Sequence, residues 1–342
     1  MKVLRMVHVQ DLAERRPSAY ELLLALEENP VADEQCFRSM GRIVDWVASH
    51  PISVEGGALD ELSLFVKTET GDLGGKLQVL FLTLSEASNP GRVRTILMGY
   101  PRWLRTVSGV ALPYFLGILP NVAAHLAVHV DELEGSGVDA LIAHFNVCAS
   151  AEDCEILSEC VERYQGVSGS VILAAAELAA LSLRTHAGPL IKKLMLVVPP
   201  SDMRQQGPAR ELLLELVKLK TVAANEFTWT AAVGACLAVT GENHLSAGHL
   251  ARNLGQAMRP LGAEMQAAFL NSLARILEEI GTSMMGYGLQ RLPEILHRDG
   301  EEHFLQLVEQ GIAISHRYGR IAAEEFFRKS NNAPREAALL SA

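Results

Sequence analysis

Residues 304–312 read FLQLVEQGI, and this stretch indicates how the whole chain folds. Apolar or small residues recur there at positions i, i+3, i+4, i+7 and i+8, the spacing that places side chains on one face of an α-helix. These positions hold Phe304, Leu307, Val308, Gly311 and Ile312. The residues between them are mostly polar, so the stretch predicts an amphipathic helix with one buried face.

The same spacing recurs elsewhere in the chain, at Val138, Leu141, Ile142, Phe145 and Cys148 and again within residues 209–221. Alternation of apolar and polar residues, which marks a half-buried strand, is hard to find. Residues 62–67 and 77–84 are the nearest candidates, and both also fit helices bounded by glycines. Because 49% of the residues are hydrophobic and only 6% are aromatic, with Leu and Ala dominant, composition also favours helix. The sequence predicts an all-α protein.

Turn-forming residues interrupt these helical patterns at short intervals, which predicts many helices joined by short turns. Serines at positions 150, 201 and 246 are candidate N-caps. Such a series of helices indicates an α-solenoid of stacked helical hairpins. No fixed-period repeat is present, so we expect a degenerate, HEAT-like stack, with an irregular helical bundle as the alternative.

The domain organisation is only weakly marked, because no long linker interrupts the 342 residues. The turn at 89–91 separates an N-terminal helical region, 1–89, from a helical-repeat-like region, 90–342. A softer sub-boundary is expected at 199–201, where two prolines are adjacent.

Charge, cysteine content and hydropathy exclude several classes of protein. A net charge of −10 argues against a nucleic-acid-binding protein. Five cysteines without a paired motif predict reduced, buried thiols in the cytoplasm. Residues 106–130 carry no Asp, Glu, Lys or Arg, but Pro120-Asn121 lies inside this run. We therefore expect two short buried helices separated at Pro120, and no membrane span.

Two further segments contain residue types that are found in binding sites. Residues 71–76, GDLGGK, contain the glycines and lysine of a phosphate-binding loop but not their spacing. One basic and aromatic cluster could hold a phosphate or an acidic helix, although a solvated helix face with Trp103 packed inward is the favoured interpretation. The cluster consists of Arg92, Arg94, Tyr100, Arg102, Trp103 and Arg105.

A possible metal site consists of His125, His129, His144 and Cys148. Each i, i+4 pair would share a helix face, and mixed histidine and cysteine ligands suit zinc. This cluster supports an alternative function, an all-helical metal-dependent enzyme or metalloprotein. The same positions also suit packed core and boundary residues, so we expect no metal, no cofactor and no catalytic residue.

The C-terminal segment 311–330 reads GIAISHRYGRIAAEEFFRKS and precedes Ala333-Pro334-Arg335-Glu336. It resembles the helical region of bacterial von Willebrand factor A-type-domain proteins that partner MoxR-class AAA+ ATPases. The resemblance rests on Tyr318-Gly319, Ala322-Ala323 and Phe326-Phe327. No Asp-x-Ser-x-Ser motif occurs, so the A-type domain itself is absent. The resemblance implies an adaptor and transfers no catalytic residue.

The expected function is therefore a non-catalytic scaffold or adaptor in a bacterial cytoplasm. Its expected partners are proteins, such as an AAA+ ATPase or a von Willebrand factor A-type domain, rather than nucleic acid or membrane. Because Phe326 and Phe327 point about 100° apart on a helix, one should be buried and the other should lie at an edge or on the surface. We expect Phe327 to be the exposed docking ring, and with Arg328 and Lys329 adjacent it would bind a partner with an acidic rim. In the alternative, residues after 332 fold back and cover both rings.

Overall fold

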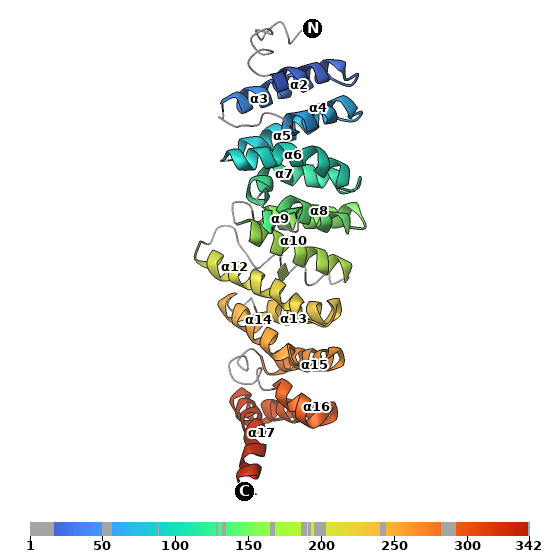
Figure 1. Cartoon of the computed structure of the whole chain (residues 1–342). Helices are drawn as coiled ribbons and strands as arrows, with labels where there is room; N and C mark the ends of the chain where they lie inside the picture. Colours follow the sequence, from blue (N-terminus) through green and yellow to red (C-terminus); the bar gives the residue numbers. More distant parts are fainter. Residues whose placement is uncertain are drawn as a thin grey trace. The chain divides into compact units, whose positions relative to one another are not determined.

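The computed structural model describes residues 17–49, 57–87, 89–127, 129–131, 135–164, 168–185, 190, 193–194, 203–239, 244–281 and 292–340. These residues are overwhelmingly helical (Figure 1). The one pair of strands that they contain is a short antiparallel hairpin of β1 (His129–Asp131) and β2 (Gly135–Ser136). The predicted all-α class is thus confirmed.

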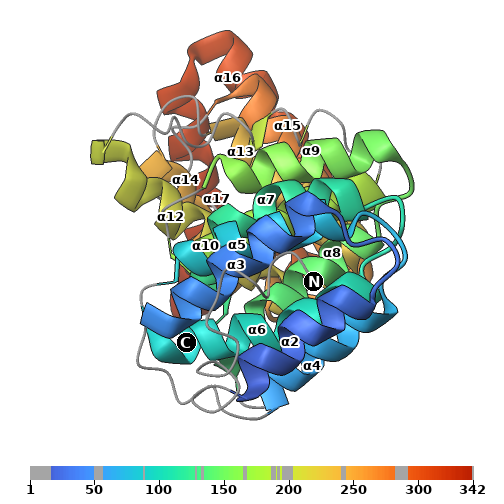
Figure 2. The ribbon, with the colours of Figure 1, turned by 90° about the horizontal axis from the view of Figure 1, so that it is seen from above.

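The first of two compact units spans Met1–Ala176. Its helices are α2 (Pro17–Glu28), α3 (Glu34–Ser49), α4 (Gly57–Thr68), α5 (Leu73–Ser85), α6 (Pro90–Thr106), α7 (Leu112–Leu126), α8 (Gly137–Asn146), α9 (Ala151–Glu162) and the first half of α10 (Gly169–Arg184). Alternate helices pack on each other. The helices α2, α4, α6 and α8 contact in series, as do α3, α5, α7 and α9. Figure 2 shows α2, α4 and α6 on one side of this unit and α3, α5 and α7 on the other.

The second unit spans Glu177–Ala342. After the end of α10 it contains α12 (Met203–Lys218), the 3-10 turn η1 (Leu219–Thr221), α13 (Glu226–Val239), α14 (His244–Met258), α15 (Ala263–Glu279), α16 (Leu292–Tyr318) and α17 (Arg320–Leu340). Here α12 packs on α14 and α13 packs on α15, before α16 packs on α15 and α17 packs on α16. This packing of alternate helices is consistent with stacked hairpins.

The division between units falls at 176–177 and does not coincide with the boundary expected at 89–91. Contacts between α4 and α6, and between α5 and α7, cross residue 89. The sub-boundary expected at 199–201 lies outside the described residues.

Polar contacts between successive hairpins have a regular separation in sequence. The amide of Asn29 donates to the carbonyl of Val66, 37 residues later, and Arg102 binds Asp139 at the same separation. In the second unit, Gln266 bonds to backbone groups that lie 42 and 44 residues earlier. These separations of about 40 residues among the described contacts are consistent with a stack of successive hairpins, although no repeated motif is visible in the sequence.

The apolar stripe in residues 304–312 is buried as predicted, because all five of its positions are shielded from solvent. Residues 62–67 and 77–84, the nearest strand candidates, lie in α4 and α5. Both helices bury leucines on one face, which the spacing of a helix allows and alternation in a strand would not.

The break expected at Pro120 is wrong. Helix α7 continues through this residue to Leu126. Proline removes one helical hydrogen bond and costs about 3 kcal/mol, but Ile118, Leu119 and Val122 are fully buried around it. Burial of each such side chain contributes about 1.5–3 kcal/mol, so packing outweighs the lost bond. Among the described residues, no helix is long and apolar enough to cross a membrane.

The expected N-caps have different outcomes. Ser150 is the N-cap of α9 and forms a reciprocal capping box with Asp153, which confirms that prediction. Helix α14 begins at His244, so Ser246 lies inside it and is not an N-cap. Ser201 lies outside the described residues.

Candidate functional site

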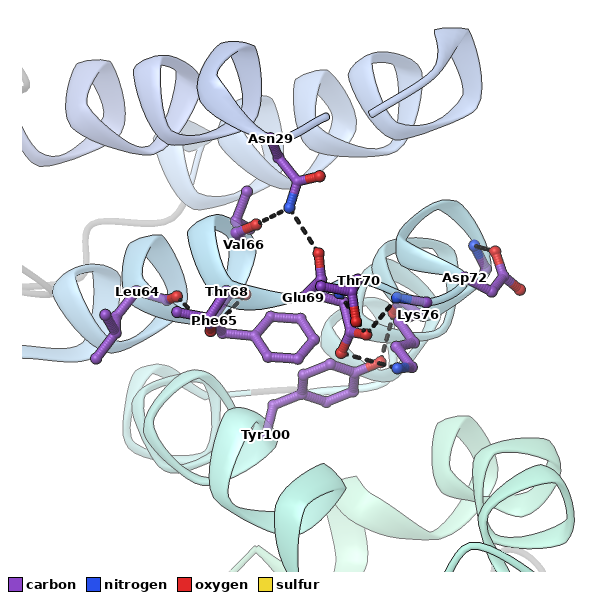
Figure 3. A network of polar contacts seen from close by, with 12 residues as sticks. Asn29, Leu64, Phe65, Val66, Thr68, Glu69, Thr70, Asp72, Lys76 and Tyr100 are labelled. Carbon is purple, nitrogen blue, oxygen red and sulfur yellow. Dashed lines mark hydrogen bonds and ion pairs between the residues drawn. The ribbon is translucent and has the colours of Figure 1, made fainter. Parts of the chain in front are cut away.

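The glycine-rich segment 71–76 forms the turn before α5 and the first turn of that helix, and its polar groups are bound by the chain itself (Figure 3). One carboxylate oxygen of Glu69 accepts hydrogen bonds from the backbone N–H groups of Thr70 and Gly71, at 3.0 and 2.8 Å. The other carboxylate oxygen pairs with the ammonium group of Lys76 at 2.8 Å. The side chain of Asp72 accepts from the N–H of Gly75 and caps α5.

This arrangement excludes the phosphate-loop interpretation. A phosphate would need the N–H groups and the lysine that Glu69 already occupies. Partial burial opposes ionisation of Glu69, but the hydrogen bonds from Lys76 and Gly71 outweigh it and lower the pKa of this carboxyl below its ordinary value of 4.5. Glu69 therefore stays ionised at neutral pH and serves as the internal anion.

Two buried polar side chains attach this turn to neighbouring helices (Figure 3). The hydroxyl of Tyr100, on α6, donates to the carbonyl of Lys76. The amide nitrogen of Asn29 donates to the carbonyls of Val66 and Glu69, at 2.5 and 2.8 Å, and its oxygen accepts from the N–H of Val31. The bonds from Asn29 satisfy carbonyls at the end of α4, and the bond from Tyr100 joins α6 to α5, so the network is structural.

The basic and aromatic cluster on α6 also serves packing. Tyr100 and Trp103 are fully buried, which confirms the inward orientation expected for Trp103. Arg102 donates two hydrogen bonds to the carboxylate of Asp139 on α8, at 2.9 and 2.7 Å. Arg105 lies 3.8 Å from Glu61 on α4. These two arginines therefore connect α6 to the helices on either side of it.

The proposed histidine and cysteine cluster is not assembled as its spacing predicts. Helix α7 ends at Leu126, so His129 lies in β1 and does not share a helix with His125. Helix α8 ends at Asn146, and Cys148 lies beyond it, with its sulfur 3.8 Å from the carbonyl of His144. The described residues contain no group of three or more His, Cys, Asp or Glu side chains placed to hold a metal ion. The side chain of His129 lies outside the described part of the structure.

The C-terminal helices form a hairpin whose two phenylalanines have different environments. Gly319, at φ +87°, makes the turn between α16 and α17, a conformation that other residues rarely adopt. Phe327 is 2% exposed, and its ring lies on Gly311 of α16. Phe326 is only half-buried, and the two ring centroids are 5.6 Å apart. The expectation that one ring is buried and the other lies at an edge is confirmed.

The choice of Phe327 as the exposed docking ring is wrong, because this ring fills the space left by Gly311. The folding back expected as the alternative is also not observed, since α17 continues as one helix to Leu340. The continuous helix leaves Phe326 to line a groove between α16 and α17.

This C-terminal groove has a volume of about 660 Å³. It is lined by Arg298, Asp299, His303, Gln306, Leu307, Gln310, Phe326 and Ser330. A kink at Gly300, where φ is 83° and ψ is 168°, divides α16 and places Arg298 and Asp299 before its second segment. His303, Leu307 and Gln310 follow at helical spacing along that segment, opposite Phe326 and Ser330 of α17.

Several groups around the groove are paired. Arg298 binds both carboxylate oxygens of Asp299, at 2.6 and 2.5 Å, and this contact lowers the pKa of Asp299. On α17, Arg328 and Lys329, one turn after Glu325, both pair with its carboxylate and lower its pKa, with Arg328 the larger influence. The hydroxyl of Ser330 donates to the carbonyl of Phe326 at 2.9 Å. It is therefore not positioned as an activated nucleophile.

Other apolar side chains of the hairpin point elsewhere. Ile321 is 84% exposed and Tyr318 is 66% exposed. Ile321 and Phe326 are five residues apart on α17, which places them about 140° apart around the helix. Ile321 therefore does not belong to the groove and provides a matched exposed site on the same helix.

The groove was not predicted from sequence beyond its phenylalanine. Gln306, Gln310 and Ser330 are ordinary polar residues of exposed helix faces and carry no motif. The available signal was the Asp299-Gly300 break, which indicates a change in direction but not what lies beside it.

Comparison with known proteins finds no matching family model, no matching curated protein and no matching solved structure. The groove geometry and its chemistry are therefore the basis for a functional proposal.

Proposed function

We propose that this chain is a non-catalytic helical scaffold of degenerate HEAT-like type that binds another protein in the C-terminal groove. The observation that supports this proposal most directly is the groove itself, about 660 Å³ in volume, with Phe326 half-exposed in its wall. A half-buried aromatic ring beside polar side chains is typical of an anchor site for a partner's apolar residue.

The lining residues support binding rather than catalysis. Leu307 and Phe326 provide an apolar surface, and the amides of Gln306 and Gln310 can both donate and accept hydrogen bonds. The hydroxyl of Ser330 is engaged with its own helix. A peptide segment that inserts one apolar side chain between the helices would use this apolar surface and the two amides.

The charge near the groove supports a partner with an acidic rim. Three cations, Arg298, Arg328 and Lys329, accompany two carboxylates, Asp299 and Glu325. Residues 298–330 together hold five Arg or Lys and six Asp or Glu, so a partner with an acidic rim would meet mainly the exposed ends of Arg328 and Lys329. Electrostatic complementarity of this kind selects a partner and speeds association more than it adds affinity.

We retain an AAA+ ATPase or a von Willebrand factor A-type domain as the proposed partner class, on the C-terminal resemblance. The cytoplasm is the proposed location, because all five cysteines are free thiols. Bacterial origin and the absence of catalytic activity also stay predictions.

Site-specific photocrosslinking tests the proposal. A photoreactive benzoylphenylalanine at Gln310, inside the groove, is expected to crosslink a partner in an extract of the source organism. The matched control carries it at Leu305, which is exposed and lies about 140° around the same helix. The partner is then purified, and its binding to the full chain is measured by calorimetry.

The expected result is that Phe326→Ala weakens binding of the purified partner at least tenfold, whereas Ile321→Ala leaves it unchanged. Equal crosslinking from both positions, or equal affinity of the Phe326→Ala variant and the unaltered chain, would overturn the proposal. Circular dichroism of each variant shows whether the hairpin is still folded.

A further inference from the structure

One exposed face of α6 is basic. Arg94, Met98, Arg102 and Arg105 follow one another at spacings of three or four residues, so their side chains lie within about 80° around the helix. Each of these residues is exposed, Met98 by 45%. The sequence of α6 contains no Asp or Glu. These four residues form the basic face of α6.

Part of this positive charge is not neutralised within the chain. Arg102 pairs with Asp139 at 2.7 Å, and Arg105 lies 3.8 Å from Glu61, but both arginine side chains are still more than half exposed. Arg94 forms no hydrogen bond or ion pair in the described part of the structure. Because a guanidinium group has five N–H donors, all three arginines can bind a further carboxylate.

Helix α9 has the opposite pattern. Glu152, Glu155, Glu159 and Glu162 are exposed and also lie within about 80° around their helix. Arg163 pairs with Glu159 at 3.0 Å, whereas the other three glutamates have no partner among the residues that the structure describes. Helix α7, which packs beside α9, contains no Lys or Arg that could neutralise them. These four glutamates form the acidic face of α9.

The two faces have similar lengths but lie on different sides of the first unit. At 1.5 Å per residue, the basic face extends about 16 Å along α6, and the acidic face extends about 15 Å along α9. Helix α6 belongs to the series of α2, α4, α6 and α8, whereas α9 belongs to the series of α3, α5, α7 and α9. Figure 2 shows α6 and α9 apart, on different sides of this unit. The faces of one chain therefore cannot bind each other, whereas the faces of two copies can.

We propose that the basic face of α6 binds the acidic face of α9 on a second copy of this chain. Three arginines then meet four glutamates over nearly the same length of helix. Met98 lies between the arginines, where its flexible side chain can pack on the aliphatic stems of the glutamates. Each copy carries one face of each kind on different sides, so the association is head to tail and open-ended.

The association should be weak and sensitive to salt, because exposed ion pairs contribute little individually. At about 0.15 M salt, charges more than about 8 Å apart are screened, which reduces the general repulsion between copies while charges in contact still attract. This repulsion is expected because each copy carries a net charge of −10. At about 1 M salt the screening length falls to about 3 Å, and the copies should separate.

Sedimentation velocity of the full chain over a range of concentrations tests the proposal. The unaltered chain should sediment faster as its concentration rises at about 0.15 M salt, and as a single copy at about 1 M. Arg94→Glu and Glu155→Arg should each weaken the association at least tenfold. Neither substitution breaks a described contact within the chain. The matched controls are Arg38→Glu and Glu86→Arg, at exposed positions in α3 and after α5, which change the net charge equally and should leave the association unchanged.

A mixture of the two interface variants identifies the pairing of the faces. The Arg94→Glu chain retains its acidic face, and the Glu155→Arg chain retains its basic face. Together they should form a pair of one copy each with the affinity of the unaltered contact, and nothing larger, because the altered faces stop growth at both ends.

An unaltered chain that stays a single copy at every concentration would overturn the proposal. A mixture that does not pair, or a control weakened as much as Arg94→Glu, would overturn it as well. A chain that stays single but binds a glutamate-rich helical peptide through Arg94 would show that this face takes a different protein, and self-association would then be rejected.

Discussion

The contact between Phe327 and Gly311 predicts that Gly311→Ala destabilises the unaltered chain but stabilises a chain that also carries Phe327→Ala. The ring of Phe327 is 2% exposed and lies on the backbone of α16 at Gly311. Truncating such a ring removes its burial and leaves a cavity, so Phe327→Ala should cost about 3–5 kcal/mol of stability in this hairpin.

The second perturbation is Gly311→Ala. A methyl group at Gly311 would lie 2.2 Å from Cζ of Phe327 and 2.4 Å from Cε2. Overpacking of this kind costs about 1–3 kcal/mol of stability. The higher helix propensity of alanine than of glycine offsets about 1 kcal/mol of this cost. We therefore expect a net loss in the unaltered chain. In the Phe327→Ala chain the ring is gone, so the same substitution should stabilise by about 0.5–1 kcal/mol.

Hydrogen–deuterium exchange of peptides from α16 and α17 is the suitable assay, because stacked helices can open locally. A loss of 3–5 kcal/mol corresponds to exchange that is about two to four decades faster. If Gly311→Ala destabilises equally in both backgrounds, the ring does not lie on this glycine and the reasoning is wrong. Protection unchanged by Phe327→Ala would show that the ring is not part of the core.

Three other predictions concern polar bonds and glycines. The first unit should lose stability as the pH falls below about 4.5. The pKa of Glu69 is lower in the folded chain than in the unfolded chain, so the stability that the ionised carboxylate contributes is lost when it is protonated. Glu69→Gln should make the stability less dependent on pH in acid titrations followed by circular dichroism. The buried amide of Gln266 makes four hydrogen bonds to backbone groups. Gln266→Leu should therefore lower the free energy of unfolding, measured in urea, by about 2–4 kcal/mol. An unchanged urea midpoint would contradict this. Gly117→Ala, in an open helical position of α7, should raise the melting temperature, whereas Gly319→Ala, at φ +87°, should lower it; shifts of the same sign would refute the distinction.

The candidate site was only partly predictable from sequence. The adjacent phenylalanines indicated that one ring would be buried and one would lie at an edge, because their angular separation on a helix is independent of what surrounds them. Which ring is buried depends on Gly311, which lies 16 residues earlier than Phe327 and becomes its neighbour only when the hairpin closes. The groove beside Phe326 likewise requires the kink at Gly300 and two separate helices.

The sequence by itself determined that the protein is helical, because the spacing of residues such as Phe304, Leu307 and Val308 acts within one helix. It also determined local features such as the cap at Ser150 and the turn at Gly319, which involve residues within a few positions of each other.

Only the tertiary structure decided which polar groups meet across hairpins. Glu69 occupies the N–H groups of the glycine-rich turn, His129 is separated from His125 by the end of α7, and α7 continues through Pro120 because surrounding side chains bury it. Each outcome depends on packing between helices, and side chains from neighbouring helices come to the same place only after the chain folds. Contacts about 40 residues apart therefore join neighbouring helices, while local sequence patterns define only the helices themselves.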